Sequence, residues 1–401
     1  MLVQKTGKET IKYINKQNIL NTFWGKEEVA KTEVIASTNL SAATVSALVQ
    51  ELMEEGFIQE CRIGESSGGR RPVMYTLNRG LAYILTVQVM TKGIRMGVVD
   101  LAGNVMECQM IPETLHGKEA LQEALPKAIR SFLDAHPEKK EKIASITISV
   151  PGVVDYSRCV LIYSAALAIE ELDLKALIKS VFSHRKKQPS VYLFKDTDAL
   201  VLGEMACAQD ERRNMAYILC ENGVGMSVVL HGSLFIGNSC GMELGHTAVD
   251  LHGEFCKCGA KGCLGVLLGE QAAVKHYIQL YEQQKTEWSS DPMFLTYEDI
   301  VELYLDDDPI AQQVIDNQLK ILAVAIVNVV NLFNPKWVVI GGPLAKLSVV
   351  EEQVAQEVKR KVLKPFAGNL QVTTSKIGVK AALLGMANYT LRKEFFRTVR
   401  C

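Results

Sequence analysis

Hydrophobic residues in the first 78 positions recur at the spacing of three short amphipathic helices. The first helix is predicted over residues 9–23, the second over 26–37, and the third begins after the N-cap residue Ser41. Two short apolar runs, 57–61 and 73–77, then predict a pair of strands joined by a loop. Three helices closed by a hairpin make a winged helix-turn-helix. Its predicted core residues are Ile11, Ile14, Ile19, Leu20, Phe23, Val29, Val34, Ile35, Val45, Leu48, Val49 and Leu52.

From about residue 79 the pattern changes to buried strands that alternate with longer helices. Such alternation predicts an α/β sheet that is covered by helices on both faces. The apolar run 321–327 stops at Asn328, well short of a membrane span, so no membrane partner is expected. The expected strands are 82–90, 94–100, 146–150, 190–194, 216–219 and 337–340, and the expected helices are 117–135, 198–209, 269–284 and 309–333.

Composition narrows the class of protein. A length of 401 residues allows two or three domains, and 48% hydrophobic with 22% charged residues is ordinary for a soluble globular chain. The net charge of -1 favours no particular partner. No N-terminal segment has the order of a signal peptide, and most of the ten cysteines show no disulfide spacing. A reduced, cytoplasmic location is therefore expected.

The third helix of a winged helix-turn-helix enters the major groove of DNA with its N-terminal residues. Glutamine can pair with adenine, alanine can touch a thymine methyl group, and hydroxyl groups can reach phosphates or bases. Residues 1–78 hold nine Lys and Arg against nine Asp and Glu, so phosphate contacts need a subset such as Lys26, Lys31 and the Arg70–Arg71 pair. A module that contacts only proteins is the alternative. The predicted DNA-binding residues are Ser41, Ala43, Thr44, Ser46, Ala47, Gln50, Arg70 and Arg71.

A compact set of metal ligands lies in the second half of the chain. His246 is followed by Cys256, Cys258 and Cys263, with glycines between the thiols. Structural zinc sites take four nitrogen or sulfur ligands in a tetrahedron, and this segment supplies one such set. Buried cysteines or a disulfide are the alternative. We expect Zn²⁺ as the cofactor, bound by these four residues.

Together these residues resemble the ROK family, which is named for repressors, open reading frames and sugar kinases. Residues 66–72 look like the junction of ROK repressors, 150–155 resembles a family turn, and 243–246 with the cysteines matches its zinc signature. The resemblance implies an α/β, actin-like, two-lobed domain of the sugar kinase and ribonuclease H-like type behind the winged helix. The implied division is 1–78 for the DNA-binding domain, 79–195 for lobe 1 with a returning C-terminal helix 382–401, and 196–381 for lobe 2 with the zinc site.

The motifs that a ROK kinase needs for ATP are altered. The phosphate-binding turn corresponds to residues 88–92, which lack both the expected carboxylate and the glycines. Lys92 either attracts an anion or is a solvated turn residue. A second loop, Gly223–Gly225, is partly kept, but Pro343 removes an amide donor after Gly341–Gly342. The resemblance therefore implies a protein that is not an enzyme.

The sugar-binding motifs are mixed. Asp196 matches the catalytic aspartate of the family and is expected as a vestige, with no catalytic residue assigned. Lys195 replaces a sugar-binding asparagine, and its ammonium is expected to hold Asp196 ionised, as a base or in an ion pair. Asp198 is expected to cap the next helix. Glu243 and His246 match residues that hold sugar hydroxyls, although Glu243 could instead support the zinc loop.

The sequence thus predicts a cytoplasmic transcriptional regulator of carbohydrate metabolism, as a repressor that binds operator DNA as a homodimer or homotetramer. Its effector would be a sugar or sugar derivative, xylose being one candidate, held by Asp196, Glu243 and His246. Gly265 stands where the family has another glutamate, which predicts an altered ligand preference. The alternatives are an ATP-dependent hexose kinase with a DNA module, and a scaffold that binds neither DNA nor sugar.

Overall fold

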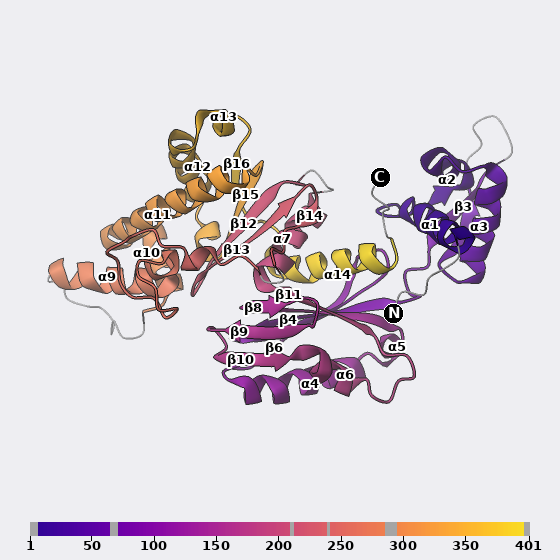
Figure 1. Cartoon of the computed structure of the whole chain (residues 1–401), viewed down its shortest axis with the longest axis horizontal. Coiled ribbons are helices and arrows are strands. Elements are labelled where there is room, and N and C mark those ends of the chain that lie inside the picture. The colour runs from indigo at the N-terminus through magenta and orange to yellow at the C-terminus, as the bar shows by residue number, and fades with distance from the viewer. Residues whose placement is uncertain (1–6, 65–70, 209–211, 239–240, 285–294, 397–401) are drawn as a thin grey trace.

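The computed structural model describes residues 7–64, 71–208, 212–238, 241–284 and 295–396. An N-terminal module of helices and a small sheet lies beside two larger α/β lobes, and a C-terminal helix runs between the lobes toward the module (Figure 1). The expected α/β class with a small helical module in front is confirmed.

The N-terminal module contains three helices and a three-stranded sheet of order β1-β3-β2. Residues 26–37 are not one helix as predicted, because residues 29–30 pair with β3 before the helix begins at Lys31. Ile11 was predicted in the core but is 60% exposed. The elements are α1 (Gly7–Asn21), β1 (Val29–Ala30), α2 (Lys31–Thr38), α3 (Ala42–Glu54), β2 (Ile58–Ile63) and β3 (Val73–Leu77).

A short turn joins α2 to α3. Asn39 ends α2 in the left-handed conformation, with φ of 56°. Ser41 Oγ accepts a hydrogen bond from the Thr44 amide at 3.2 Å, so the predicted N-cap of α3 is confirmed. Val45, Leu48, Val49 and Leu52 are buried against the module core, which leaves the opposite face of α3 exposed.

Lobe 1 contains a five-stranded sheet of order β11-β7-β4-β5-β6. Helices α4 and α6 bury one face of this sheet, and the C-terminal helix packs on the other. A separate small sheet has the order β10-β9-β8. The elements are β4 (Tyr83–Met90), β5 (Gly93–Val99), β6 (Val105–Pro112), α4 (Lys118–Asp134), α5 (Pro137–Lys140), β7 (Ile143–Val150), β8 (Val153–Asp155), β9 (Val160–Ser164), β10 (Ile169–Asp173), α6 (Leu174–Val181) and β11 (Ser190–Lys195).

Lobe 2 contains a second five-stranded sheet, of order β14-β13-β12-β15-β16. Its large core lies between the sheet and the helices that follow it in sequence. The elements are α7 (Asp196–Cys207), β12 (Met215–Cys220), β13 (Val224–Leu230), β14 (Ser233–Leu234), η1 (Leu244–His246), α8 (Leu264–Leu268), α9 (Glu270–Gln284), α10 (Tyr297–Leu305), α11 (Pro309–Phe333), β15 (Trp337–Gly341), η3 (Pro343–Lys346), α12 (Val349–Lys361), α13 (Lys364–Ala367), β16 (Gln371–Thr374) and η4 (Gly378–Lys380).

Helix α11 spans Pro309–Phe333, the predicted range, and Asn328 lies inside it. Among the described residues it is the one helix long and apolar enough to cross a membrane. However, 56% of its most apolar window is buried inside the protein. Ile315, Leu322 and Ile326 belong to the core of lobe 2, so the apolar character of α11 serves packing within the fold.

Two helices connect the lobes. Helix α7 leaves lobe 1 directly after β11, and α14 (Ala381–Glu394) returns from lobe 2. They cross so closely that a Cβ on Gly385 would lie 2.1 Å from the Ala199 carbonyl oxygen. A Cβ on Gly203 would lie 2.3 Å from the Ala381 carbonyl oxygen. Only glycine allows this approach of the two backbones.

The far end of α14 enters the N-terminal module. The Phe396 ring lies 4.7 Å from Trp24, and Phe395 lies 6.4 Å from Phe57, measured between ring centroids. One continuous hydrophobic core therefore contains residues of the module, of lobe 1 and of α14. This core includes Ile19, Leu20, Phe23, Val45, Val49, Ile84, Val99, Leu101, Ala387 and Leu391.

Candidate metal centre and effector site

The loop from η1 to α8 closes on itself and brings four ligand side chains together. His246 ends η1, and Cys263 immediately precedes α8. The return of the loop depends on Gly262, which has a φ of 64° and lies so close to Asp250 that a Cβ would meet its carbonyl oxygen at 1.5 Å. A glycine is thus required between the thiols.

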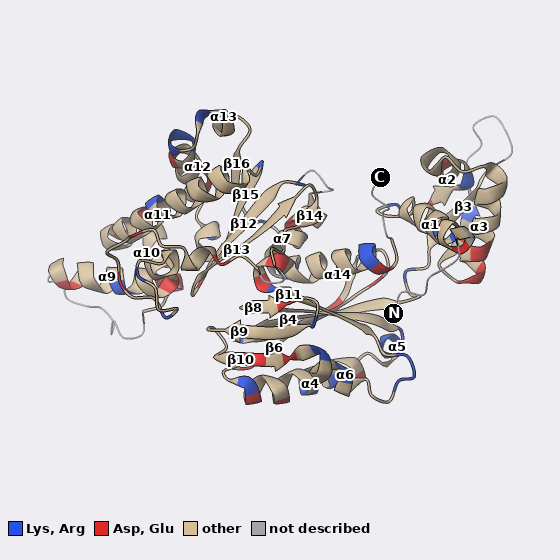
Figure 2. Cartoon of the chain, viewed as in Figure 1, with Lys and Arg blue, Asp and Glu red and all other residues tan. Residues whose placement is uncertain are grey.

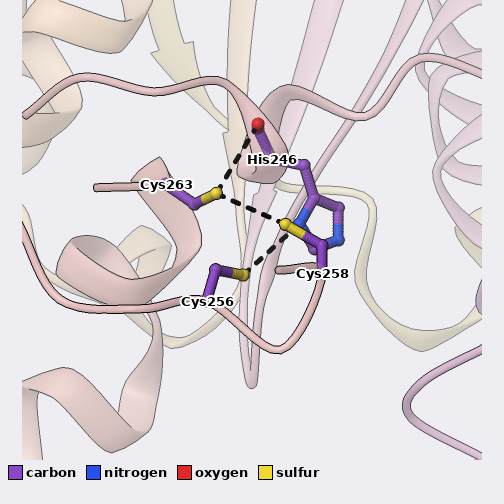
Figure 3. A group of neighbouring side chains, drawn as sticks. All are labelled: His246, Cys256, Cys258 and Cys263. Carbon is purple, nitrogen blue, oxygen red and sulfur yellow. Dashed lines mark hydrogen bonds between the residues drawn. The ribbon is translucent and has the colours of Figure 1, made fainter. Parts of the chain in front are cut away.

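The four ligand atoms of His246, Cys256, Cys258 and Cys263 all lie within 4.8 Å of one another (Figure 3). The His246 Nδ1 atom is 3.6 Å from Cys256 Sγ, and Cys258 Sγ is 3.6 Å from Cys263 Sγ. Zinc bonds of about 2.0–2.3 Å separate neighbouring tetrahedral ligands by about 3.5–3.8 Å, which agrees with both distances. The three cysteines are free, with no disulfide between them. The cluster is therefore able to bind a metal ion.

The protonation of the thiols depends on their surroundings. A backbone hydrogen bond from Ala260 lowers the pKa of Cys258 to about 7, whereas burial raises the pKa of Cys263 to about 12. Metal ions bind thiolates, so binding has to release the proton of the buried Cys263. The second ring nitrogen of His246 points away from the thiols (Figure 3) and is not needed for the cluster.

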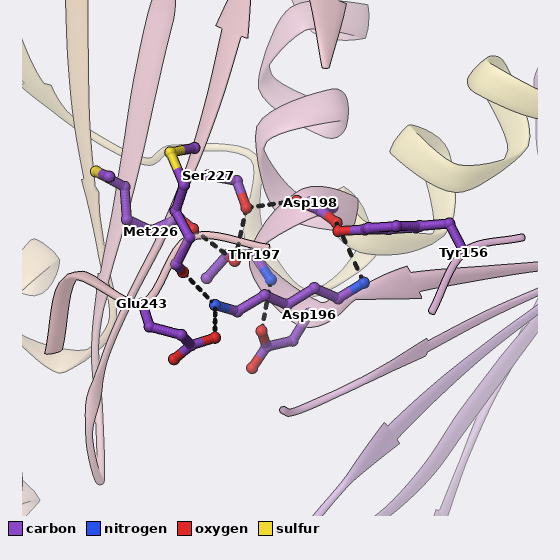
Figure 4. A network of polar contacts seen from close by, with 9 residues as sticks. Tyr156, Asp196, Thr197, Asp198, Met226, Ser227 and Glu243 are labelled. Carbon is purple, nitrogen blue, oxygen red and sulfur yellow. Dashed lines mark hydrogen bonds and ion pairs between the residues drawn. The ribbon is translucent and has the colours of Figure 1, made fainter. Parts of the chain in front are cut away.

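A polar network surrounds the start of α7 (Figure 4). The Asp198 carboxylate accepts hydrogen bonds from Tyr156 Oη at 2.5 Å and from Ser227 Oγ at 2.6 Å. It also accepts the backbone amide of Lys195 at 3.3 Å. Asp198 is the third residue of α7, so its prediction as the N-cap is wrong, and the N-cap position is Lys195. Burial raises the pKa of Asp198.

The ammonium of Lys195 is directed toward lobe 2. Its Nζ atom donates to Glu243 Oε1 and to the Met242 carbonyl oxygen, both at 2.6 Å, and its side chain is only 3% exposed. Gly241 makes room for this side chain, because a Cβ there would lie 2.9 Å from Lys195 Cδ. Lys195 therefore joins the start of α7 to the segment that leads into the metal loop, which is the loop from His246 to Cys263 that carries the four ligands.

Asp196 lies on the same side of the network as Glu243 (Figure 4). Its Oδ1 atom accepts the Thr197 amide at 2.7 Å. Burial raises the pKa of Asp196 to about 7, and the charge of Lys195 opposes this shift without cancelling it. Contrary to the prediction, the charge of Lys195 does not keep the pKa of Asp196 in its ordinary low range, because burial has the larger effect.

The structure brings Asp196, Glu243 and His246 into one region. Glu243 and His246 flank η1, and the His246 amide donates to the Glu243 carbonyl oxygen at 3.0 Å. Lys195 connects Glu243 to Asp196, its neighbour in sequence. Sequence reasoning missed Tyr156 and the Lys195–Glu243 pair, since no local pattern links residues so far apart in the chain.

Residues 88–92, which correspond to a phosphate-binding turn, carry side chains where glycines would leave room for a phosphate. Gln88 is 8% exposed, and its Oε1 atom accepts a hydrogen bond from Arg95 Nη1 at 2.9 Å. The Gly341–Gly342 pair is explained by packing, because a Cβ on Gly342 would lie 1.9 Å from the Cys220 carbonyl oxygen.

Lys92 lines a cavity of about 510 Å³ together with Asn222, Glu270, Tyr297 and Glu298. Burial, and then repulsion by Glu298, raises the pKa of Glu270. A second lysine, Lys275, also lines the cavity, so its two ammonium groups balance the two carboxylates.

The residues predicted to contact DNA lie at the exposed face of α3. Ser41, Ala43, Ser46, Ala47 and Gln50 are exposed and Thr44 is half-buried, while Arg71 is exposed after the loop and Arg70 lies outside the described residues. Lys26, which is expected to contact phosphate, pairs with Glu33 at 3.1 Å on the surface. Lys31 lies 5.3 Å from the centre of the Tyr75 ring.

Comparisons with known proteins agree with this fold. The sequence profile of the ROK family matches residues 85–393. The xylose repressor of Bacillus subtilis strain 168 is 26% identical over 384 residues, which cover 95% of this chain and 96% of that protein. The DNA-binding transcriptional dual regulator NagC of Escherichia coli K12 is 24% identical over 379 residues, with coverage of 94% and 92%.

Solved structures show the same relationship. A ROK family transcriptional regulator described as a homolog of the E. coli MLC protein has a TM-score of 0.81 and 25% identity, covering 95% of this chain and 96% of its own. The ROK hexokinase of Thermus thermophilus has a TM-score of 0.62 and 22% identity, covering 78% of this chain and 99% of its own. The expected two-lobed architecture is therefore confirmed.

Proposed function

The chain belongs to the ROK family, and we propose that it is a sugar-responsive transcriptional repressor that binds operator DNA through its N-terminal module. The similarity to these regulators extends over 94–95% of the chain, and this observation carries the proposal. The B. subtilis xylose repressor and the MLC homolog each match 95% of this chain, whereas the hexokinase matches 78% while using 99% of its own length. The N-terminal module is thus shared with the regulators.

We assign residues 1–78 to DNA binding, 79–195 with the C-terminal helix to lobe 1, and 196–381 to lobe 2. The protein would act in the cytoplasm as a homodimer or homotetramer, because two modules on two half-sites raise the affinity of a module that has few free basic residues. The exposed N-terminal face of α3 supports its assignment as the helix that enters the major groove.

We further assign Zn²⁺ to His246, Cys256, Cys258 and Cys263. The mixed nitrogen and sulfur donors and their tetrahedral spacing support this ion. When bound, zinc holds the loop closed and fixes the His246 ring through Nδ1. The other ring nitrogen is then free to donate a hydrogen bond to an effector, and the tautomer is set by the metal bond.

The effector would bind beside Asp196, Glu243 and His246. Lys195 already occupies one oxygen of Glu243, so an effector has to share that carboxylate with an ammonium. Its binding would shift α7, which carries Asp196, and α7 crosses α14 at the glycine contact described above. Because α14 ends in the core of the DNA-binding module, a preference of ~1.4 kcal/mol for one lobe arrangement is enough to change operator affinity tenfold.

A selection experiment tests the repressor proposal. The purified full-length chain is mixed with random duplex DNA, and bound duplexes are recovered with and without xylose, glucose or N-acetylglucosamine. We expect one enriched, two-fold related sequence, and release of that duplex by at least one sugar. Recovery of no enriched sequence contradicts the proposal.

A kinase assay tests the enzymatic alternative. The chain is incubated with ATP, Mg²⁺ and a panel of hexoses and xylose, and ADP formation is measured. We expect no turnover above background, because the Gln88 side chain occupies the segment that corresponds to the phosphate-binding turn. Turnover that disappears in Asp196→Ala would establish the kinase instead.

A further inference from the structure

We propose that α3 recognises its half-site mainly through thymine methyl groups, with Ala43 and Ala47 against two thymines, and that it requires no guanine. This inference rests on the proposed DNA-binding function and specifies the sequence class of its ligand. The exposed N-terminal face of α3 consists of Ser41, Ala42, Ala43, Ser46, Ala47 and Gln50. Of these residues, only Gln50 has a side chain that is long enough to extend beyond its neighbours toward a base.

The charge distribution limits which part of α3 can approach DNA. Between Ala42 and Glu54, α3 contains no lysine or arginine, and its acidic residues lie in its last turn (Figure 2). Glu51 there pairs with Lys12 and Lys16, both at 2.8 Å, so these lysines are already engaged. The acidic end of α3 is repelled by phosphates. The first two turns are therefore the part that enters the groove.

The chemistry of this face determines which bases it can read. Guanine is usually recognised by arginine or lysine, which donate to its O6 and N7 atoms, and α3 offers neither residue. The Gln50 amide nitrogen donates to Glu54 at 3.1 Å, which leaves its carbonyl oxygen to accept from an exocyclic amino group, that of adenine or cytosine, so selection of A·T pairs rests on the alanines. Alanine methyl groups match the thymine C5-methyl. The face is therefore complementary to A·T pairs.

The spacing of the alanines gives the proposal its geometry. Residues four apart on a helix rise about 6 Å along its axis and share one face. Successive bases of one strand are about 3.4 Å apart, so two steps span about 7 Å. Ala43 and Ala47 would thus meet thymines two steps apart when the helix lies along the groove.

The test removes single methyl groups from the operator. A duplex selected by the full-length chain is resynthesised with each thymine replaced in turn by deoxyuridine, which lacks only the C5-methyl group. Binding is measured by fluorescence anisotropy. We expect two positions per half-site, two steps apart, at which the replacement weakens binding about fourfold, the effect of losing one buried methyl.

Matched variants assign each methyl group to its residue. Ala47→Gly is expected to weaken binding to the thymine duplex and to make it insensitive to deoxyuridine at one position only. Ala36→Gly, the same change at an exposed position of α2, controls for the loss of helix stability. It should leave both deoxyuridine effects in place.

The outcomes separate this inference from the function on which it rests. Selection of no sequence contradicts the DNA-binding function itself. The thymine proposal is overturned if the selected half-site has G·C pairs at the positions that Ala43→Gly and Ala47→Gly alter and if deoxyuridine has no effect. That outcome leaves the proposed repressor function intact.

Discussion

At the scale of single residues, the Lys195–Glu243 ion pair decides how the proposed effector site is charged. The sequence suggested an ammonium beside Asp196, but the side chain extends away from its neighbour to a carboxylate on another segment. Glu243 is 34% exposed while Lys195 is 3% exposed, so the pair is solvated at one end only. An effector that needs Glu243 as an acceptor has to compete with this ammonium.

Asp196 gives a pH-dependent prediction. Its pKa is about 7 in the folded chain and 3.8 without the fold, so the folded state holds the proton more tightly. Its contribution to stability is therefore complete below pH 4 and lost as the pH rises to about 7. Relative to Asp196→Asn, the parent should lose on the order of 2 kcal/mol of unfolding free energy between pH 4 and 7.

Urea unfolding of both proteins at several pH values measures this difference. Asp316→Asn, a change on the exposed face of α11, is the control and should track the parent at every pH. A gap between the parent and Asp196→Asn that stays constant over this range is incompatible with the raised pKa.

At the scale of elements, sequence reasoning succeeded where local signals mark both ends of a long segment. Helix α11 begins and ends where predicted, because Asp308 caps its start and Asn334 terminates it in the left-handed conformation. The strands β1 and β8 were not predicted, since two or three residues carry little pattern and depend on partners elsewhere in the chain. The longer strands β6 and β13 were missed as well.

The same reasoning explains which parts of the site could be predicted. The cysteine cluster was visible because its ligands are close in sequence and share one loop. Tyr156 and Ser227 meet on Asp198 only after three separate segments have folded, so spacing in the chain gave no sign of them. The Asp198 carboxylate was assigned to a cap because its immediate neighbours alone were considered.

The metal loop gives a prediction at this scale. Cys258→Ser removes one of four ligands, so the purified variant should contain less zinc than the parent, which should hold one ion per chain by elemental analysis. Its melting temperature should fall by about 5 °C or more, because loss of a structural metal releases the loop.

Cys108→Ser, an exposed cysteine on β6, should keep both the zinc content and the melting temperature of the parent. Equal metal content in Cys258→Ser and Cys108→Ser would show that the cluster is not the zinc site.

At the scale of the whole molecule, α14 is the element that contacts every part. It packs on α7, on the sheet of lobe 1 and, through Phe395 and Phe396, on the N-terminal module. The Glu394 carboxylate also accepts hydrogen bonds from Ser145 and Tyr192, which ties the end of α14 to lobe 1. One helix thus links α7 to the N-terminal module by direct contacts.

The crossing of α7 and α14 can be tested with one methyl group. Gly385→Ala places a Cβ against the Ala199 carbonyl oxygen, where neither backbone can move aside without separating the helices. We expect a loss of about 2–4 kcal/mol in unfolding free energy, measured in urea. Gly368→Ala, where nothing lies within 4 Å of an added Cβ, should be close to neutral. Similar stability of the two variants would argue against a tight crossing.

The aromatic contacts of Trp24 with Phe396 and of Phe57 with Phe395 join the first segment of the chain to one of its last. During synthesis on the ribosome, the N-terminal module emerges hundreds of residues before α14 exists, and until then part of its apolar surface has no cover. A nascent or prematurely terminated polypeptide that lacks α14 therefore has an N-terminal module with an incomplete hydrophobic core. If the proposed repressor function is correct, binding to operator DNA requires that α14 has already been synthesised.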